Sequence, residues 1–86
     1  MASREVPLTG KDQEPLEVDA RGLMCPLPLL RLKKALSGID SGDILRIQTT
    51  DPAAELDFGV FLEQMGHTLL ARSDSDGVQC HLIRKK

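Results

Sequence analysis

The segment that decides the fold is Cys25-Pro26-Leu27-Pro28-Leu29-Leu30-Arg31-Leu32-Lys33-Lys34-Ala35-Leu36. Proline is tolerated in the first turn of a helix, because the N–H group that it lacks would have no partner there. Pro26 and Pro28 therefore mark a helix start. The leucines that follow recur on one helical face, and Gly38 is a natural stop. We predict a helix over residues 26–37 whose buried face is formed by Leu29, Leu32, Ala35 and Leu36.

Cys25 lies at or just before this helix start. Free backbone N–H groups and the positive end of the helix dipole favour an anion there. A free thiol has a pKa of about 8.5, and such a position can lower it towards neutrality. We therefore interpret Cys25 as a nucleophile held as a thiolate, helped by Arg21, Arg31 and Lys34. The alternative is a small buried core residue, which is how most free cysteines behave.

Four strands and a second helix complete the pattern. Alternation and turn signals predict strands over 16–20, 43–50, 67–72 and 78–84, with a turn over 73–77. The second helix is expected to have Asp51 as N-cap, Pro52 at its first position and Gly66 as its stop. Its predicted buried residues are Phe58, Phe61, Leu62 and Met65. The fold class is α/β (α+β): a two-layer β-α-β-α-β-β sandwich with two helices on a four-stranded mixed sheet, in which the first two strands are parallel.

Composition restricts the possible functions. The chain has 86 residues, a net charge of −2 and no Trp or Tyr, which argues against direct nucleic-acid binding. No apolar stretch approaches the roughly 20 residues of a membrane span, and the N-terminus lacks a signal-peptide pattern. We expect a cytoplasmic protein that is monomeric when free. Residues 1–15 are expected to form a flexible arm, and residues 16–86 one domain.

The sequence resembles the TusA/SirA-like sulfur-carrier family. The resemblance rests on the run from Leu16 to Pro28 with its Cys-Pro-x-Pro motif, on Thr49-Thr50-Asp51-Pro52, on Asp57, on Gly66-His67 and on the closing residues 82–85. It implies a small protein to which a cysteine desulfurase transfers persulfide sulfur, on Cys25. It also implies a downstream sulfur-accepting protein, in tRNA 2-thiolation or a related sulfur transfer. Such a protein is a covalent carrier with sulfurtransferase-type chemistry rather than a self-contained enzyme.

The residues around Cys25 support a carrier in their own right. Pro28 stands where a thioredoxin-like pair would have its second cysteine, so sulfur on Cys25 cannot be expelled locally as a disulfide. Met24 and Leu27 are expected to form an apolar collar around the thiol. Arg31 and Lys34 are expected to present a positive surface to an acidic partner.

Other chemistry has weaker support in the sequence. Cys80 alternates with Val78 and Leu82 and is expected to face the core. Neighbouring Cys80 and His81 point to opposite faces of a strand, so no metal site and no cofactor are expected. His67 is interpreted as a residue at a helix end rather than a base for the thiol. The alternative function is a non-catalytic regulatory or interaction module with a redox-sensing or structural cysteine.

Overall fold

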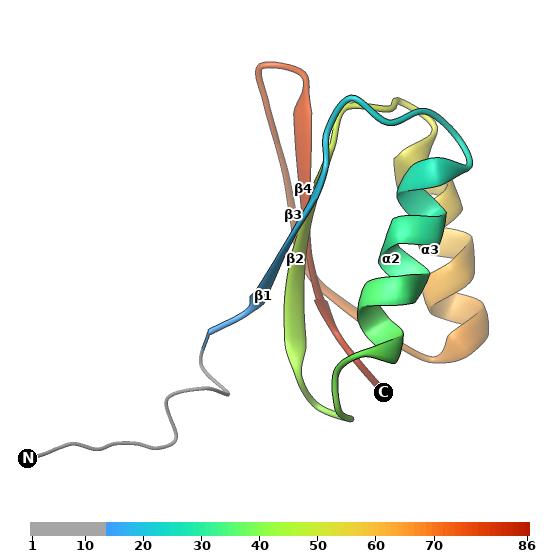
Figure 1. Cartoon of the computed structure of the whole chain (residues 1–86), viewed down its shortest axis with the longest axis vertical. Helices are drawn as coiled ribbons and strands as arrows, with labels where there is room; N and C mark the ends of the chain where they lie inside the picture. The colour runs from blue at the N-terminus through green and yellow to red at the C-terminus, as the bar shows by residue number, and fades with distance from the viewer. Residues whose placement is uncertain (1–13) are drawn as a thin grey trace, which may run out of the picture.

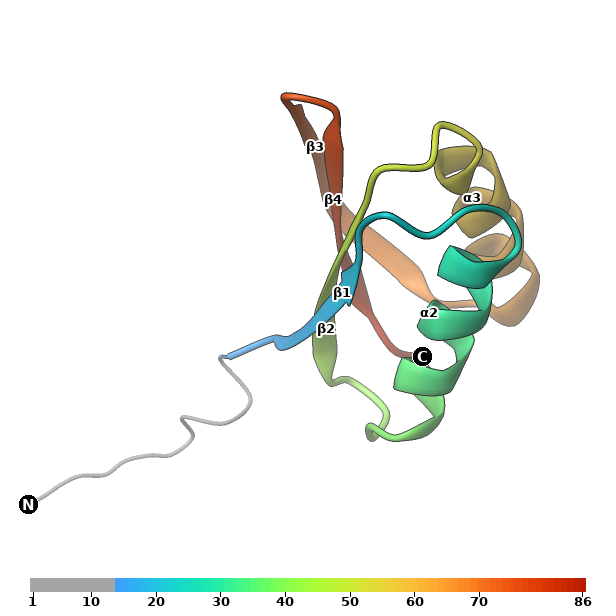
Figure 2. The same ribbon diagram turned by 45° about the horizontal axis from the view of Figure 1, so that its top comes forward.

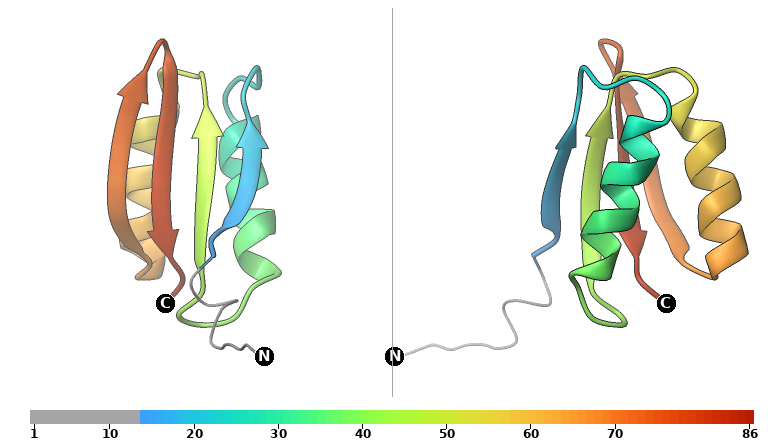
Figure 3. Two further views of the ribbon diagram at one scale, coloured as in Figure 1. Left: turned by 90° about the vertical axis from the view of Figure 1, so that its left-hand side faces the viewer. Right: turned by 45° about the vertical axis from the view of Figure 1, so that its right-hand side comes forward.

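A computed structural model describes residues 14–86, and it confirms the predicted order of elements. The predicted arm falls almost wholly on residues 1–13, outside the described residues. Both helices cover one face of a single mixed sheet, and the other face of the sheet carries no helix (Figures 1 and 3). The elements are β1 (Leu16–Ala20), α2 (Leu27–Ser37), β2 (Ile44–Thr49), α3 (Ala54–Met65), β3 (Thr68–Ser75) and β4 (Val78–Arg84).

The strand order across the sheet is β1-β2-β4-β3. β1 runs parallel to β2, as the sequence predicts, with Val18 opposite Ile47. β4 lies antiparallel between β2 and β3, with His81 opposite both Ile47 and Arg72. The carboxyl ends of β1 and β2 therefore lie at the same edge of the sheet, and each leads into a helix.

The core lies between the sheet and the two helices. α2 contributes Leu32 and Leu36, and α3 contributes Phe58 and Leu62. The prediction for α3 was partly wrong, because Phe61 is only half-buried and the side chain of Met65 is 54% exposed. The buried residues of α3 form a narrow stripe at four-residue spacing: Ala54, Phe58 and Leu62. Met65 lies outside this stripe, as the last residue of the helix. The sheet side of the core consists of Ala20, Leu45, Ile47 and Ile83.

The two helix starts differ from each other. α2 begins at Leu27, with Pro26 as its N-cap and Pro28 buried in its first turn, so the prediction is confirmed to within one residue. α3 begins at Ala54, and Pro52 is therefore not its first residue, contrary to our prediction. Asp51 Oδ1 accepts the backbone N–H of Ala53 over 3.0 Å, which closes a turn ahead of the helix.

The hairpin between β3 and β4 is tighter than the sequence suggested. β3 continues to Ser75, and the turn is only Asp76-Gly77, with φ of 53° and 81°. Positive φ at both positions matches the twist of a two-residue hairpin, which Asp-Gly favours. On β4, the side chains of His81 and Ile83 are buried under the helices.

The prediction that Cys80 faces the core is wrong. Cys80 is half-buried and lies opposite Gln48 and Ser73, one position from the buried His81. Successive side chains of a strand point to opposite faces, so Cys80 lies on the helix-free face of the sheet.

Candidate functional site

The candidate site lies where two loops meet at the carboxyl ends of the parallel strands. One loop leads from β1 to α2 and carries Cys25, and the other leads from β2 to α3 (Figure 2). Because α2 and α3 both follow parallel strands, their N-termini lie at this same edge. A hydrogen bond joins the loops, since the N–H of Gly22 donates to Thr50 Oγ1 over 2.9 Å.

A second and shorter bond fixes Cys25 itself. Its backbone N–H donates to Asp51 Oδ2 over 2.6 Å, while the other oxygen of Asp51 accepts from Ala53. Asp51 is only 3% exposed, and both of its bonds are partly buried. A charge-assisted bond to a carboxylate is among the stronger kinds of hydrogen bond. Asp51 therefore determines where the backbone of Cys25 sits.

The thiol of Cys25 is exposed and faces a carboxylate. Sγ donates to Asp57 Oδ2 over 3.5 Å, and Asp57 lies in the first turn of α3. The hydrogen bond to Asp57 raises the pKa of Cys25, with contributions from burial and from the charges of Asp57 and Asp51. Our prediction of a thiol stabilised as thiolate is therefore wrong for the free protein.

The start of α2 explains part of the difference between the predicted lowering of the Cys25 pKa and its raised pKa in the structure. The N–H of Leu27 donates to the carbonyl oxygen of Met24 over 2.8 Å, and Pro28 has no N–H to offer. Fewer free backbone N–H groups therefore remain at this helix start to stabilise a thiolate than we predicted from the sequence.

Two of the three basic residues that were expected to help the thiolate, Arg21 and Arg31, have other partners. Arg21 Nε pairs with Asp19 Oδ1 at 2.9 Å, and this ion pair lowers the pKa of Asp19 to about 2. Arg31 Nη1 donates to the backbone oxygen of Asp19 over 3.0 Å. The guanidinium groups of both residues are therefore bound to Asp19 and not to the thiol.

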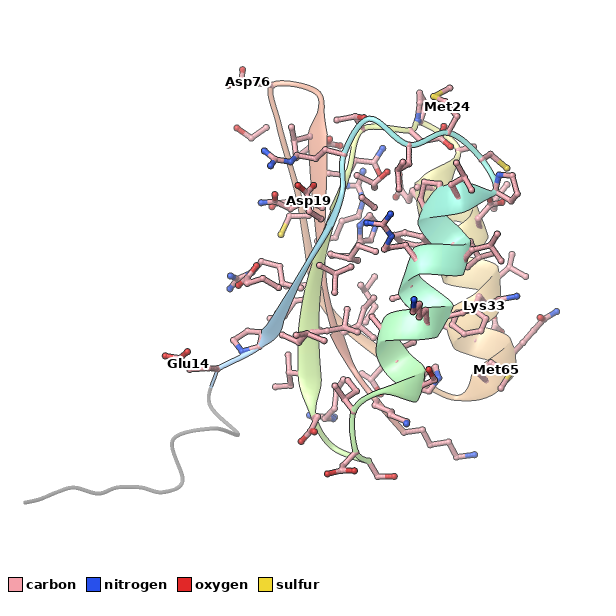
Figure 4. The ribbon with its side chains drawn as sticks, in the orientation of Figure 1. Glu14, Asp19, Met24, Lys33, Met65 and Asp76 are labelled. Atoms are coloured by element: carbon pink, nitrogen blue, oxygen red, sulfur yellow. The ribbon has the colours of Figure 1, made fainter. Side chains whose placement is uncertain are left out.

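The predicted partner-binding residues lie close to one another on the surface. Leu27, Arg31 and Lys34 line a groove of about 190 Å³ together with Leu23 and Leu30. The side chains of Met24 and Leu27 are 63% and 49% exposed. Met24 lies at the end of the molecule where β1 leads into α2 (Figure 4). An apolar collar next to a basic helix face is therefore available at the Cys25 end.

The other candidate residues lie elsewhere. His67 follows the C-terminus of α3, at the end of the molecule opposite Cys25, and its Nδ1 accepts the N–H of Lys86 over 3.0 Å. Among residues 14–86, no three His, Cys, Asp or Glu side chains are grouped so that they could hold a metal ion. Within the same residues, no helix is long and apolar enough to cross a membrane.

Sequence reasoning missed the roles of two acidic residues at this site. Asp51 was interpreted as a helix cap, and Asp57 only as part of the family resemblance. The parallel arrangement of the first two strands could have revealed both, because it places the starts of the two helices at one edge. A carboxylate within the first turn of α3 is then a neighbour of Cys25.

Comparison with known proteins gives a consistent result. Residues 16–85 match the family described as Sulfurtransferase TusA. The sulfur carrier protein TusA of Allochromatium vinosum is 44% identical over 70 residues, which cover 81% of this chain and 91% of that protein. The TusA of Pseudomonas syringae is 36% identical, over 81% of this chain and 83% of its own length.

A solved structure agrees with these relatives. The crystal structure of a SirA-like protein from Desulfitobacterium hafniense superposes with a TM-score of 0.72 at 27% identity. The match covers 80% of this chain and 95% of that one. Fold, site and sequence therefore agree, and the chain belongs to the TusA family of sulfur carrier proteins.

Proposed function

We propose that this protein carries sulfur as a persulfide on Cys25. A cysteine desulfurase supplies the sulfur, and a partner sulfurtransferase or second carrier accepts it, in tRNA 2-thiolation or a related transfer in the cytoplasm. The observation that carries the proposal is an exposed thiol with no second thiol beside it, since Cys80 lies on the far face of the sheet. Sulfur bound to Cys25 then has to wait for a thiolate from another protein.

The chemistry is an exchange that leaves the total oxidation state unchanged. The Cys25 sulfur attacks the outer sulfur of the donor's persulfide and forms a new S–S bond. The donor's S–S bond breaks, and its cysteine leaves as a thiolate that takes up a proton from solvent, which balances the proton that Cys25 loses. In the onward step, a thiolate of the acceptor attacks the outer sulfur on Cys25, and Cys25 leaves as a thiolate.

The surface around the thiol supports docking of such partners. Met24 and Leu27 offer exposed apolar area beside Cys25, and Arg31 and Lys34 add positive charge on the next turns of α2. A patch of this composition excludes water at its centre and attracts an acidic partner at its rim. Pro26 and Pro28 support the site indirectly, because they fix the start of α2.

Mass spectrometry after incubation with a cysteine desulfurase and cysteine tests the proposal. We expect a gain of about 32 Da, the mass of one sulfur atom, that a reducing agent reverses. Cys25→Ser should show no gain, and Cys80→Ser should gain sulfur like the native protein. Loading that persists in Cys25→Ser and disappears in Cys80→Ser would refute the assignment.

A further inference from the structure

The contact between Cys25 and Asp57 exists only while the thiol is protonated. Sγ is the donor and Asp57 Oδ2 the acceptor, 3.5 Å apart. A thiolate has no proton to donate, and it would face the carboxylate as a like charge. The pKa of Cys25 is raised, mainly by this hydrogen bond, which agrees with the geometry.

No cationic side chain in the described part of the chain forms an ion pair with Asp57. Arg21 and Arg31 are bound to Asp19, and among residues 14–86 Asp57 takes part in no ion pair. Lys33, which is labelled in Figure 4, lines the same groove as Asp57, but its Nζ lies 5.3 Å from the centroid of the Phe61 ring and forms no ion pair with Asp57 among residues 14–86. The carboxylate of Asp57 is therefore open to an ion pair with a cation from outside the described residues.

Asp57 is also accessible from outside. It is half-buried and lines a groove of about 290 Å³ between α2 and α3. The other walls are formed by the apolar side chains of Leu29, Leu56, Val60 and Phe61 and by the polar side chains of Lys33 and Gln64. A partner side chain with an apolar stem and a cationic head, such as arginine or lysine, fits this combination.

We propose that Asp57 keeps the Cys25 thiol protonated in the free protein, and that a cationic side chain of the protein persulfide donor pairs with Asp57 and releases the thiolate. The inference rests on the proposed function, in which such a donor exists. The proton passes to solvent as the thiolate forms. Attack on the donor's outer sulfur then proceeds as described above, and the departing donor thiolate takes up a proton from solvent.

This arrangement has a clear chemical advantage. A thiolate is the form that oxidants attack, and Cys25 is exposed with no second cysteine to rescue it as a disulfide. A thiol that ionises only when the donor is bound is protected between encounters. Reactivity is then confined to the complex in which sulfur transfer takes place.

The first experiment needs no partner protein. In a Cys80→Ser background, the rate at which neutral iodoacetamide alkylates Cys25 is measured against pH. We expect Asp57→Asn to shift the profile to lower pH and to raise the rate at neutral pH severalfold. Glu63→Gln, which removes an exposed carboxylate from the same helix, should leave the profile unchanged. Superimposable profiles for the native residue and Asp57→Asn would overturn the inference.

The second experiment compares two sulfur donors with the same variants. With sodium polysulfide, Asp57→Asn should load severalfold faster than the native protein. With a cysteine desulfurase and cysteine it should load more slowly, because the contact for the donor's cation is lost. Equal acceleration with both donors would overturn the role of the partner's cation.

Two further results keep the tests separable. Asp57→Ala, which also removes the carboxylate, should behave like Asp57→Asn in both experiments. Thermal melts establish that each variant folds. If the native protein is loaded by neither donor, the proposed function fails and the partner's role fails with it. The alkylation profile still decides whether Asp57 holds the proton on Cys25.

Discussion

The backbone N–H of Cys25 donates to the buried carboxylate of Asp51 over 2.6 Å, across 26 positions of sequence. The bond joins the loop before α2 to the loop before α3. The position of Cys25 is therefore a property of the assembled fold rather than of its own helix.

Removing the Asp51 carboxylate should affect both stability and loading. Asp51→Ala leaves the N–H groups of Cys25 and Ala53 without their acceptor. Losing the partner of a fully buried group costs about 1–3 kcal/mol, and because these two N–H groups are only partly buried, each loss should lie at or below the lower end of that range. We expect a lower free energy of unfolding in urea and slower sulfur loading of the folded variant. Asp51→Asn keeps one acceptor oxygen and should show a smaller loss. Native stability in Asp51→Ala would contradict this role.

A charge within the apolar collar should disturb docking and leave folding intact. The side chain of Leu27 is 49% exposed, so Leu27→Asp should melt like the native protein. Sulfur transfer should fall roughly tenfold or more, since 1.4 kcal/mol at the contact corresponds to a factor of ten. Met65→Asp is the control, because Met65 is similarly exposed but lies at the C-terminal end of α3, away from Cys25. If Leu27→Asp unfolds the protein, Leu27 belongs to the core. If it folds and transfers sulfur normally, the partner docks elsewhere.

Reversing the charge of the helix face should slow association. Arg31 and Lys34 are exposed and line the same groove, so they can steer an acidic partner. We expect the double variant Arg31→Glu/Lys34→Glu to transfer sulfur more slowly at low salt and to show a weaker dependence on salt. Transfer rates measured over a salt series provide the test. Reversal of Arg84, an exposed charge at the end of β4, is the control. Equal salt dependence in native and double variant would exclude steering by this face.

Acid should destabilise the fold through His81. His81 is 1% exposed, it packs edge-on against Phe58 at 5.0 Å, and its two ring nitrogens have no partner among the described residues. Burial lowers its pKa from 6.5, and the charge of Arg72 adds to this effect. Below the unfolded value of about 6.5, the unfolded chain binds a proton that the folded protein resists. Stability should therefore be complete above that pH and fall as the pH drops towards the folded pKa.

Urea unfolding over a pH series tests this assignment. A single such group gives a slope of at most about 1.4 kcal/mol per pH unit. His81→Leu should remove most of the loss. The pKa of His67 is also lowered, mainly by burial, so His67→Gln measures the contribution of the second histidine. An unchanged slope in His81→Leu would show that other groups cause the acid loss.

The sequence predicted the elements well where periodicity is strong. Leu32 and Leu36 define α2, and the alternation from Leu16 to Ala20 defines β1, because one side of each element has to be apolar. The orientation of β4 was harder to predict, since Val78, Cys80 and Leu82 form a more apolar set than Gln79, His81 and Ile83. Only the register of β4 with β2 shows that the second set faces the helices.

The chemistry of the site was less predictable than its location. The helix-start motif correctly predicted that Cys25 lies just before α2, but the hydrogen bond of its thiol is to Asp57, 32 positions away. A local argument from the helix dipole could not include this carboxylate. The pairing depends on how α3 packs beside α2, which is a tertiary property.

The direction of the strands has a practical consequence for assays. β1 starts, and β4 ends, at the end of the molecule opposite the loop that carries Cys25 (Figure 1). A tether joined after Lys86 therefore leaves from the far end, where the N–H of Lys85 is held by the carbonyl oxygen of Asp43 over 2.8 Å. Immobilised on a sensor surface through this end, the protein presents its thiol to solution. Binding of sulfur donors and acceptors can then be followed without the attachment blocking the groove that Leu27, Arg31 and Lys34 line.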